Sequence, residues 1–264
     1  MKLWYQSLAR ETEATPYGAI LKRVIDRCAD AGTEVHLQGI HESAGIGVHY
    51  RFLEYHDTRE VIYNALRAHR EGFDAVLIGN ASDSGILAAR EVVSIPVLGL
   101  TETSLLVSCM MGATAGLITV SDKWTPRIME NVRRLGFEAR VVGAEGLNTS
   151  PLELKKAMVD DRLRANVMDD FMAAARRLLA KGAEVIIPAG GDVIVFLAEA
   201  GTYEIERAPI VNGIVELVKM GELAVRLHQH TGRFTSKRFG FAAPSDAFLQ
   251  RIRDFYGPDV YPGA

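Results

Sequence analysis

The hydrophobic residues of this chain fall into short runs that alternate with segments of helical period. Gly, Pro, Asn or Asp bound these runs, and most runs are apolar throughout, as expected for strands buried on both faces of a sheet. Strands and helices that alternate in this way predict an α/β fold with a mostly parallel sheet flanked by helices. The predicted strands are Lys2–Gln6, Glu34–Gln38, Asp74–Gly79, Val97–Leu100, Ala115–Val120, Ala139–Gly143, Glu184–Pro188 and Pro209–Val211.

Start and stop signals frame the predicted helices. Thr15 followed by Pro16 is typical of a helix start, and apolar residues then recur at helical spacing until Gly32. Thr125 and Pro126 repeat this start signal. Further helices are predicted over about 83–91, 101–111, 164–181 and 213–230.

An internal repeat divides the chain into two similar halves. The segment Asp74–Asp83, with Ile95–Gly99 further on, has a counterpart in Glu184–Asp192, with Pro209–Gly213 further on. Each copy runs strand, loop of small residues, helix and proline-led strand. The sequence therefore predicts two pseudo-symmetric lobes.

Two facing lobes would hold a ligand between them. We expect residues 1–100 and about 213–264 to form the first lobe, and residues from about 101 to 212 the second. Ligands of such sheets bind outside the carboxyl ends of the strands, so the loops at those ends should line the site. The candidate lining is Gln6, Ser7, Asn80, Ala81, Ser82, Asp83, Ser84, Thr119, Ser121, Gly190, Gly191 and Asp192.

Two of these loops could bind a carboxylate or a similar anion. Gly79–Gly85 and Ala189–Asp192 each lie between a buried strand and a helix, where backbone N–H groups point outward. Ser82 or Asp83 could instead cap the helix that follows, and Ser121 could do the same in the second half. Neither loop fits a phosphate-binding motif or a nucleophile elbow, so nucleotide binding is not supported.

Charge and cysteine content exclude several classes of function. The 264 residues carry a formal net charge of −3 with Lys and Arg scattered, which gives no footprint for nucleic acid or an anionic membrane. We expect no secretory leader and no membrane span, hence a cytoplasmic protein. Two cysteines cannot make a disulfide framework, and the seven histidines form no ligand set, so no metal is predicted.

Several short segments, spread over nearly the whole chain, are specific in their order and spacing. They are Trp4–Ser7, Ile78–Ile86, Ala88–Glu91, Ile95–Leu100, Leu117–Val120, Val185–Gly191, Val211–Ile214 and Thr235–Arg238. Together they resemble the aspartate/glutamate/hydantoin racemase superfamily, and its hydantoin racemase branch in particular. The resemblance implies two pseudo-symmetric α/β lobes with a cofactor-independent site between them. It also implies a cysteine after the third strand and another after its counterpart, one removing the substrate proton and the other returning one.

This sequence departs from the resemblance at both cysteine positions. Asn80 stands at the first position and Gly190 at the second, whereas Cys28 and Cys109 lie in predicted helices. Neither an amide nor a glycine can remove a proton from carbon near neutral pH. Racemisation by two thiols is therefore not expected, and hydantoins should show little exchange of their α-proton.

The polar lining could still carry chemistry without a thiol. We expect Asp83, Asp192, Ser82 and Asn80 to be the catalytic residues, with Asp83 or Asp192 as the base if burial raises its pKa. Hydroxyls and backbone amides could hold a carboxylate or stabilise an oxyanion. The expected substrate-binding residues are Gln6, Ser7, Ala81, Ser84, Thr119, Ser121, Gly190 and Gly191.

Three functions remain open on the sequence. The first is a cofactor-independent enzyme that acts on a small carboxylate or a cyclic amide by proton transfer, decarboxylation or ring hydrolysis. The second is a non-catalytic binder or sensor of such a molecule, and the third is a racemase that uses other bases, such as Cys109. We expect a homo-oligomer, with no nucleic-acid or membrane partner. The aromatic tail, Phe234–Ala264, could close one lobe or join subunits.

Overall fold

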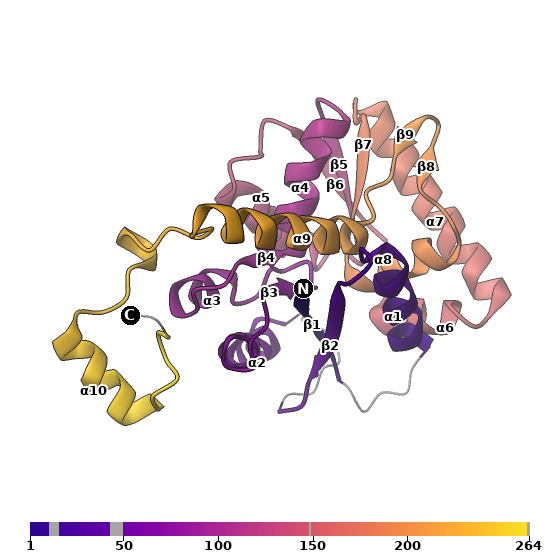
Figure 1. Ribbon diagram of the computed structural model, residues 1–264. Helices are drawn as coiled ribbons and strands as arrows, with labels where there is room; N and C mark the ends of the chain where they lie inside the picture. Colours follow the sequence, from indigo (N-terminus) through magenta and orange to yellow (C-terminus); the bar gives the residue numbers. More distant parts are fainter. Residues whose placement is uncertain (11–15, 43–49, 148, 263–264) are drawn as a thin grey trace.

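Two parallel sheets flanked by helices make up the computed structural model, which describes residues 1–10, 16–42, 50–147 and 149–262 (Figure 1). The first half holds β1 (Lys2–Arg10), α1 (Pro16–Cys28), β2 (Glu34–Ile40), α2 (Arg51–Arg70), β3 (Ala75–Ile78), α3 (Ile86–Val92), β4 (Val97–Gly99) and α4 (Leu100–Met111). The second holds β5 (Ala115–Thr119), α5 (Thr125–Arg134), β6 (Val141–Gly146), α6 (Pro151–Ala157), α7 (Asp161–Ala180), β7 (Val185–Ala189) and α8 (Gly191–Glu199). The chain continues with β8 (Glu204–Ile205), β9 (Ala208–Pro209), α9 (Gly213–Thr231), a 3-10 turn (Phe239–Phe241) and α10 (Asp246–Tyr256). The predicted fold class is confirmed.

The first sheet has the strand order β2-β1-β3-β4, with all strands parallel. Successive side chains of a strand point to opposite faces. Tyr5 of β1 therefore packs with α1 and α9, whereas its neighbour Trp4 packs with α2 and α3. By the same alternation Ser7 shares the face of Tyr5, and Gln6 shares the face of Trp4.

The second sheet repeats this arrangement in the order β6-β5-β7. Ile210 forms a parallel bridge with Ile186 of β7, so the chain after β9 occupies the place that β4 has beside β3. The two halves thus share one strand order, and the predicted pseudo-symmetry is confirmed.

One apolar core runs through both lobes. It includes Leu77 of β3, Leu117 of β5, Ile187 of β7 and Val218 of α9, all fully buried or nearly so. Helix α9 packs against α1, α4 and β3, and Figure 1 shows it lying along the boundary between the lobes. A second, smaller core lies between the first sheet and the helices α2 and α3.

Some predicted boundaries differ from the structure. Helix α3 begins at Ile86 and not at Asp83, because Asp83 has a φ of +50°, which a right-handed helix does not accommodate. Pro209 pairs antiparallel with Glu204 in a short hairpin, so the predicted parallel strand there is reduced to a single bridge. Thr15, the predicted helix start, lies outside the described residues.

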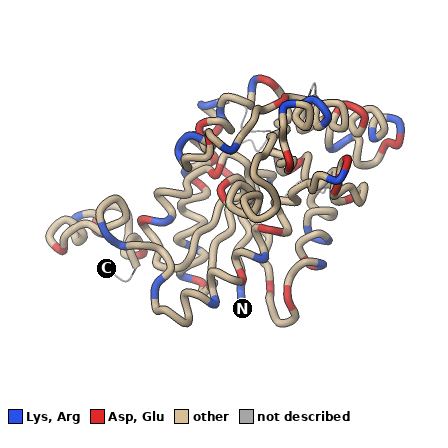
Figure 2. The backbone as a smooth tube through the Cα atoms, turned by 90° about the horizontal axis from the view of Figure 1, so that it is seen from above, with Lys and Arg blue, Asp and Glu red and all other residues tan. Residues whose placement is uncertain are grey.

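Charged side chains of both signs are spread along the whole backbone (Figure 2). The view shows blue and red segments interleaved on the outer elements, without a continuous basic stripe. Within the described part of the chain, no helix is long and apolar enough to cross a bilayer.

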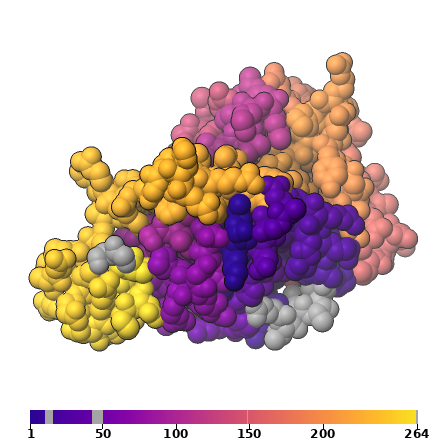
Figure 3. Space-filling view, in the orientation of Figure 1, coloured from indigo at the N-terminus to yellow at the C-terminus, as the bar shows by residue number. Residues whose placement is uncertain are grey.

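The chain beyond α9 forms a C-terminal arm, residues 232–262, that lies against the first lobe beside α2 and α3 (Figures 1 and 3). The ammonium group of Lys237 fastens it there by donating hydrogen bonds of 2.6–2.9 Å to the carbonyl oxygens of Arg90, Glu91 and Val93. These are carbonyls at the end of α3 that the helix itself leaves without partners.

Candidate active site between the lobes

The loops that follow β3 and β7 meet between the two lobes. A Cβ atom at Gly191 would lie 3.3 Å from the hydroxyl oxygen of Tyr17 and 3.7 Å from the carbonyl oxygen of Gly79. A Cβ atom at Gly190 would lie 2.8 Å from a methyl group of Val120, directly after β5. The structure therefore brings the ends of β3, β5 and β7 to one place.

Two tyrosines of the first lobe line this place. The ring of Tyr5 lies over Gly79, where a Cβ atom would come within 2.2 Å of it. The Tyr5 hydroxyl is buried and has no hydrogen-bond partner among the described residues, and burial raises its pKa. Burial also raises the pKa of Tyr17 well above its usual range, with Asp192 and Tyr5 adding to the effect and a hydrogen bond with Ser7 opposing it. Both hydroxyls therefore keep their protons near neutral pH and can act as donors.

Asn80 follows directly after Gly79, and its side-chain amide is held by its own loop. Its Oδ1 atom accepts a hydrogen bond of 2.5 Å from the Ser82 hydroxyl and one of 3.3 Å from the backbone N–H of Ser84. These contacts fix the orientation of the amide. Its Nδ2 atom is buried and has no partner among the described residues. Ser82 and Ser84 thus position the amide of Asn80.

The second lobe holds one further unpartnered group, near the carboxyl end of β5. The hydroxyl oxygen of Ser121, two residues beyond β5, is buried without a hydrogen-bond partner in the described chain. Thr119 is engaged locally, because its hydroxyl lies 2.6 Å from that of Thr125 and 3.1 Å from the Ser121 carbonyl oxygen.

Asp192 lies in the first turn of α8, close enough to Tyr17 to raise the pKa of that hydroxyl. The ammonium group of Lys155, from α6, lies 5.6 Å from the centroid of the Tyr17 ring. One acidic and one basic side chain of the second lobe therefore flank the same tyrosine of the first.

The side chain of Asp83 is engaged in helix capping. Its carboxylate accepts hydrogen bonds of 2.9 Å from the backbone N–H groups of Thr101 and Glu102, so it caps the start of α4. Burial raises its pKa to about 7, while these two N–H groups and Arg134 at 3.9 Å act in the opposite direction. We expected Asp83 to be a catalytic residue or to cap the helix directly after its own loop. It caps the next helix along the chain.

Gln6 is likewise held by its surroundings. Its amide nitrogen donates to the carbonyl oxygens of Ser7, Gln38 and Gly39, and its Oε1 atom accepts from the indole N–H of Trp4 at 3.1 Å. Its side chain lies on the face of the sheet opposite Tyr5, and of the candidate residues it contacts its neighbour Ser7 through the backbone carbonyl.

Two side chains of α5, in the second lobe, donate hydrogen bonds to backbone carbonyls of the Asn80–Ser84 loop in the first lobe. Arg127 of α5 donates a hydrogen bond of 2.8 Å to the carbonyl oxygen of Ser82, and Asn131 donates one of 2.9 Å to the same oxygen. Asn131 also donates to the carbonyl of Ala81 at 3.2 Å. The Arg127 guanidinium is paired with Glu54 of α2 at 2.6 Å, and both side chains are largely buried.

Each cysteine is engaged within its own helix, and Cys28 lies close enough to Tyr5 to add to the rise of that tyrosine's pKa. The Cys28 thiol donates to the carbonyl of Ile25 at 3.2 Å, and Cys109 donates to that of Leu105 at 3.4 Å, each within its own helix. Burial raises the pKa of Cys28 to about 11, which makes a thiolate rare there. Among the described residues, no group of three or more His, Cys, Asp or Glu side chains is arranged to hold a metal ion.

The arrangement offers neutral hydrogen-bond donors around a carboxylate. Tyr5, Tyr17, Asn80 and Ser121 can donate to a carbonyl oxygen that gains negative charge, which is how enzymes stabilise enolates and other oxyanions. Asp192 is a carboxylate whose charge acts on one of these donors, Tyr17, and raises its pKa. The site can therefore bind a polar molecule and support removal of an acidic proton.

Tyr5, Tyr17 and Lys155 were not predicted from the sequence as site residues. Tyr5 stands in an apolar strand and Tyr17 in an apolar helical stripe, so each fits a core position equally well. The signal for Tyr17 is its place directly after Pro16 at the start of the helix that follows β1. A side chain there lies at the carboxyl end of the sheet.

Comparison with known proteins gives a consistent result. Residues 19–221 match the family described as Asp/Glu/Hydantoin racemase. A hydantoin racemase from Pseudomonas sp. (strain NS671) is 26% identical over 187 residues, which cover 70% of this chain and 72% of that protein. The allantoin racemase structure from Klebsiella pneumoniae has a TM-score of 0.76 at 20% identity, covering 93% of this chain and 94% of the other. That from Pseudomonas fluorescens has a TM-score of 0.72 at 22% identity, covering 93% and 97%. The family match extends over most of the chain, and this protein belongs to the Asp/Glu/hydantoin racemase family.

Proposed function

We propose that this protein acts on small cyclic amides of the hydantoin type, exchanging the acidic proton of the ring carbon faster than it inverts that carbon, without a cofactor and without thiols. This proposal replaces the expectation from the sequence that hydantoins show little exchange of that proton. The observation that carries the proposal is the set of buried polar atoms without partners among the described residues: Tyr5 Oη, Asn80 Nδ2 and Ser121 Oγ. Buried polar groups are normally hydrogen-bonded, so a bound molecule with matching groups would complete them.

The charges beside Tyr17 favour a neutral ligand. Asp192 and Lys155 flank this tyrosine with opposite signs, and the other candidate contacts are hydroxyls and an amide. A dicarboxylate would bring two negative charges beside Tyr17, where Lys155 is the one cation and Asp192 is already an anion. The carbonyl and N–H groups of a cyclic amide match the amide and hydroxyls instead. The similarity to proteins named hydantoin and allantoin racemases supports this class of substrate.

Asp192 is the proposed base. Its carboxylate takes the proton from the ring carbon, and the electron pair of the C–H bond moves onto the neighbouring carbonyl, which becomes an enolate. Tyr17, Tyr5 and Asn80 donate hydrogen bonds to the enolate oxygen. The C–H bond re-forms when the Asp192 carboxylic acid returns a proton. Base catalysis of this kind contributes roughly 100-fold to 10,000-fold, and one oxyanion donor about 100-fold or more.

Among the described residues, the proposed site has only one that can carry the proton, Asp192, and no second carrier on the opposite face of the substrate. The resemblance implies cysteines at the positions of Asn80 and Gly190, and neither of these residues can carry a proton to carbon. The proton then returns from the side it left, so exchange with solvent keeps the configuration of the ring carbon. Exchange should outpace inversion.

The test uses an optically pure 5-substituted hydantoin in deuterated water. Deuterium incorporation is followed by NMR and inversion by polarimetry, both against the reaction without protein. We expect incorporation above this background and slower inversion. Asp192→Asn should lower incorporation at least 100-fold, whereas Asp169→Asn, an exposed carboxylate of α7, should not change it. Exchange at the background rate, or inversion as fast as exchange, contradicts the proposal.

The second candidate function is a non-catalytic binder of the same class of molecule. It is favoured by Asn80 and Gly190, which stand where the resemblance implies cysteines. A binder would be stabilised by the hydantoin in thermal unfolding but would incorporate no deuterium above background. Tyr17→Phe should weaken that stabilisation under either function, whereas Tyr203→Phe, on the surface after α8, should leave it unchanged. The exchange measurement separates the two functions.

A further inference from the structure

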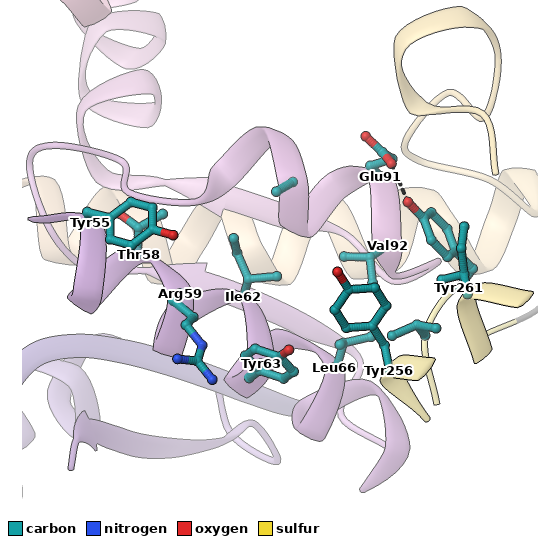
Figure 4. A pocket seen from close by; sticks show the side chains of 13 residues that line it. Tyr55, Thr58, Arg59, Ile62, Tyr63, Leu66, Glu91, Val92, Tyr256 and Tyr261 are labelled. Carbon is teal, nitrogen blue, oxygen red and sulfur yellow. Dashed lines mark hydrogen bonds between the residues drawn. The ribbon is translucent and has the colours of Figure 1, made fainter. Parts of the chain in front are cut away.

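A cavity of about 480 Å³ lies on the outer side of the first lobe, between α2, α3 and the C-terminal arm (Figure 4). Its apolar floor comes from the smaller core, and four tyrosines form much of its wall. The lining residues are Tyr55, Thr58, Arg59, Ile62, Tyr63, Leu66, Ala88, Glu91, Val92, Ile252, Tyr256, Val260 and Tyr261. This volume is within the range of small-molecule sites, which are also mostly apolar and aromatic.

The cavity is separate from the site between the lobes. It lies on the side of the first sheet that Trp4 faces, whereas Tyr5 and the candidate active site lie on the other side. Its ligand would therefore contact none of the residues proposed to act on the hydantoin.

Fixed contacts build the outer wall. Arg253 donates hydrogen bonds of 3.2 Å and 2.8 Å to the carbonyl oxygens of Val260 and Tyr261, which closes the arm on itself. Arg70 of α2 pairs with Asp259 of the arm at 2.9 Å. Together with Lys237 on α3, these contacts hold the arm against α2 and α3 and keep the cavity open.

Only two lining residues carry charge, Glu91 and the exposed Arg59. Glu91 accepts a hydrogen bond of 2.5 Å from the Tyr261 hydroxyl, drawn as the dashed line in Figure 4. The guanidinium of Arg59 lies 5.7 Å from the centroid of the Tyr63 ring and forms no ion pair with a described carboxylate. Figure 4 shows Arg59 beside Tyr63 at one end and Tyr256 with Tyr261 at the other. The cavity thus has a cationic end and an aromatic end.

We propose that this cavity binds a small aromatic carboxylate, with the carboxylate on Arg59 and the ring among Tyr63, Tyr256 and the aliphatic floor. Arg59 offers a planar fork of donors that matches a carboxylate, and the tyrosine rings offer stacking surfaces. The charge of the ligand neutralises the one lining cation that has no partner. Its ring covers apolar side chains that are otherwise open to water.

The probe is 1-naphthylacetate, with its neutral amide as the matched analogue, and binding is measured by calorimetry on the full chain. We expect the acid to bind about tenfold more tightly than the amide, because only the acid forms a charge-assisted contact. Arg59→Gln should remove this difference by weakening the acid alone. Arg162→Gln, an exposed arginine of α7, is the control and should change neither ligand.

Three results would overturn the proposal. Equal binding of acid and amide, or an unchanged acid affinity in Arg59→Gln, removes Arg59 as the anchor. Loss of acid binding in Asp192→Asn, or its competition by a hydantoin, moves the ligand to the other site and leaves the proposed function untouched. Association of the chain in sedimentation that Arg59→Gln abolishes, with no carboxylate bound, identifies the cavity as a contact between copies.

Discussion

The carboxyl group of Glu216 in α9 is largely buried, so its ionisation should lower the free energy of unfolding. Its carboxyl accepts hydrogen bonds from the backbone near Asn212, but its Oε2 atom is buried and has no partner among the described residues. Burial raises its pKa from 4.5 to about 7. The substitution Glu216→Gln keeps a side chain of the same shape and removes the charge.

The protonated Glu216 carboxyl favours the folded state, so raising the pH lowers the stability of the fold. In the unfolded chain the carboxyl titrates near 4.5 and in the folded protein near 7, so the folded state holds the proton more strongly. The stability from this group is complete below pH 4.5 and is lost as pH rises to 7. The shift of about 2.5 units corresponds to roughly 3 kcal/mol at most, and we expect about 1–3 kcal/mol because the side chain is not fully buried. Glu216→Gln should therefore be more stable than the parent by this amount at pH 8.

The assay is urea unfolding of both proteins at pH 5 and pH 8. The stability difference between them should be near zero at pH 5 and should favour Glu216→Gln at pH 8. Asp83 also has a pKa raised to about 7, but it titrates in both proteins and cancels. Glu199→Gln, which loses an exposed pair with Arg23, is the control and should show no such pH dependence. A difference that is the same at both pH values would refute the reasoning.

Three further substitutions test contacts described above. Gly79→Ala should lower the free energy of unfolding by about 1–3 kcal/mol, because its Cβ atom would overlap the Tyr5 ring, and thermal unfolding measures this. Arg127→Met should cost about 2–4 kcal/mol in urea unfolding, since it leaves the buried Glu54 carboxylate with only the more distant Arg51 at 3.8 Å, and a loss below 1 kcal/mol would contradict this. Lys237→Met should release the C-terminal arm from α3, so limited proteolysis should cleave residues 232–262 at least several-fold faster with the rest of the chain intact.

The fold was predictable because most strands are buried on both faces. Continuous apolar runs such as Ala75–Ile78 and Val185–Ala189 are typical of the buried strands of an α/β protein, and the internal repeat then predicted two similar halves. The strand order within each half was not predicted. The helix start at Asp83 was predicted wrongly. Asp83 has a left-handed backbone, and its carboxylate accepts a hydrogen bond from the backbone N–H of Thr101, 18 residues further along the chain. Local sequence rules do not contain such a contact.

The candidate site was predictable by location more than by chemistry. The loops after β3 and β7 were named from the topology, and the structure brings them together. The partners of the individual side chains were not predictable. Gln6 is a polar residue at a strand end, yet its amide serves main-chain carbonyls of β2, while the apolar-looking Tyr17 reaches the site.

Asn80 and Gly190, where the resemblance implies cysteines, lie just outside the sheets. The ladder between β1 and β3 ends at Ile78, and that between β5 and β7 ends at Ala189, so neither Asn80 nor Gly190 contributes to strand register. Backbone pairing, which does not depend on side-chain identity, keeps the frame in place while these two residues vary. A protein built in this way can change either residue without a change of strand register, although a side chain at Gly190 would have to displace a methyl group of Val120. Its reaction is thus free to diverge while its architecture stays the same.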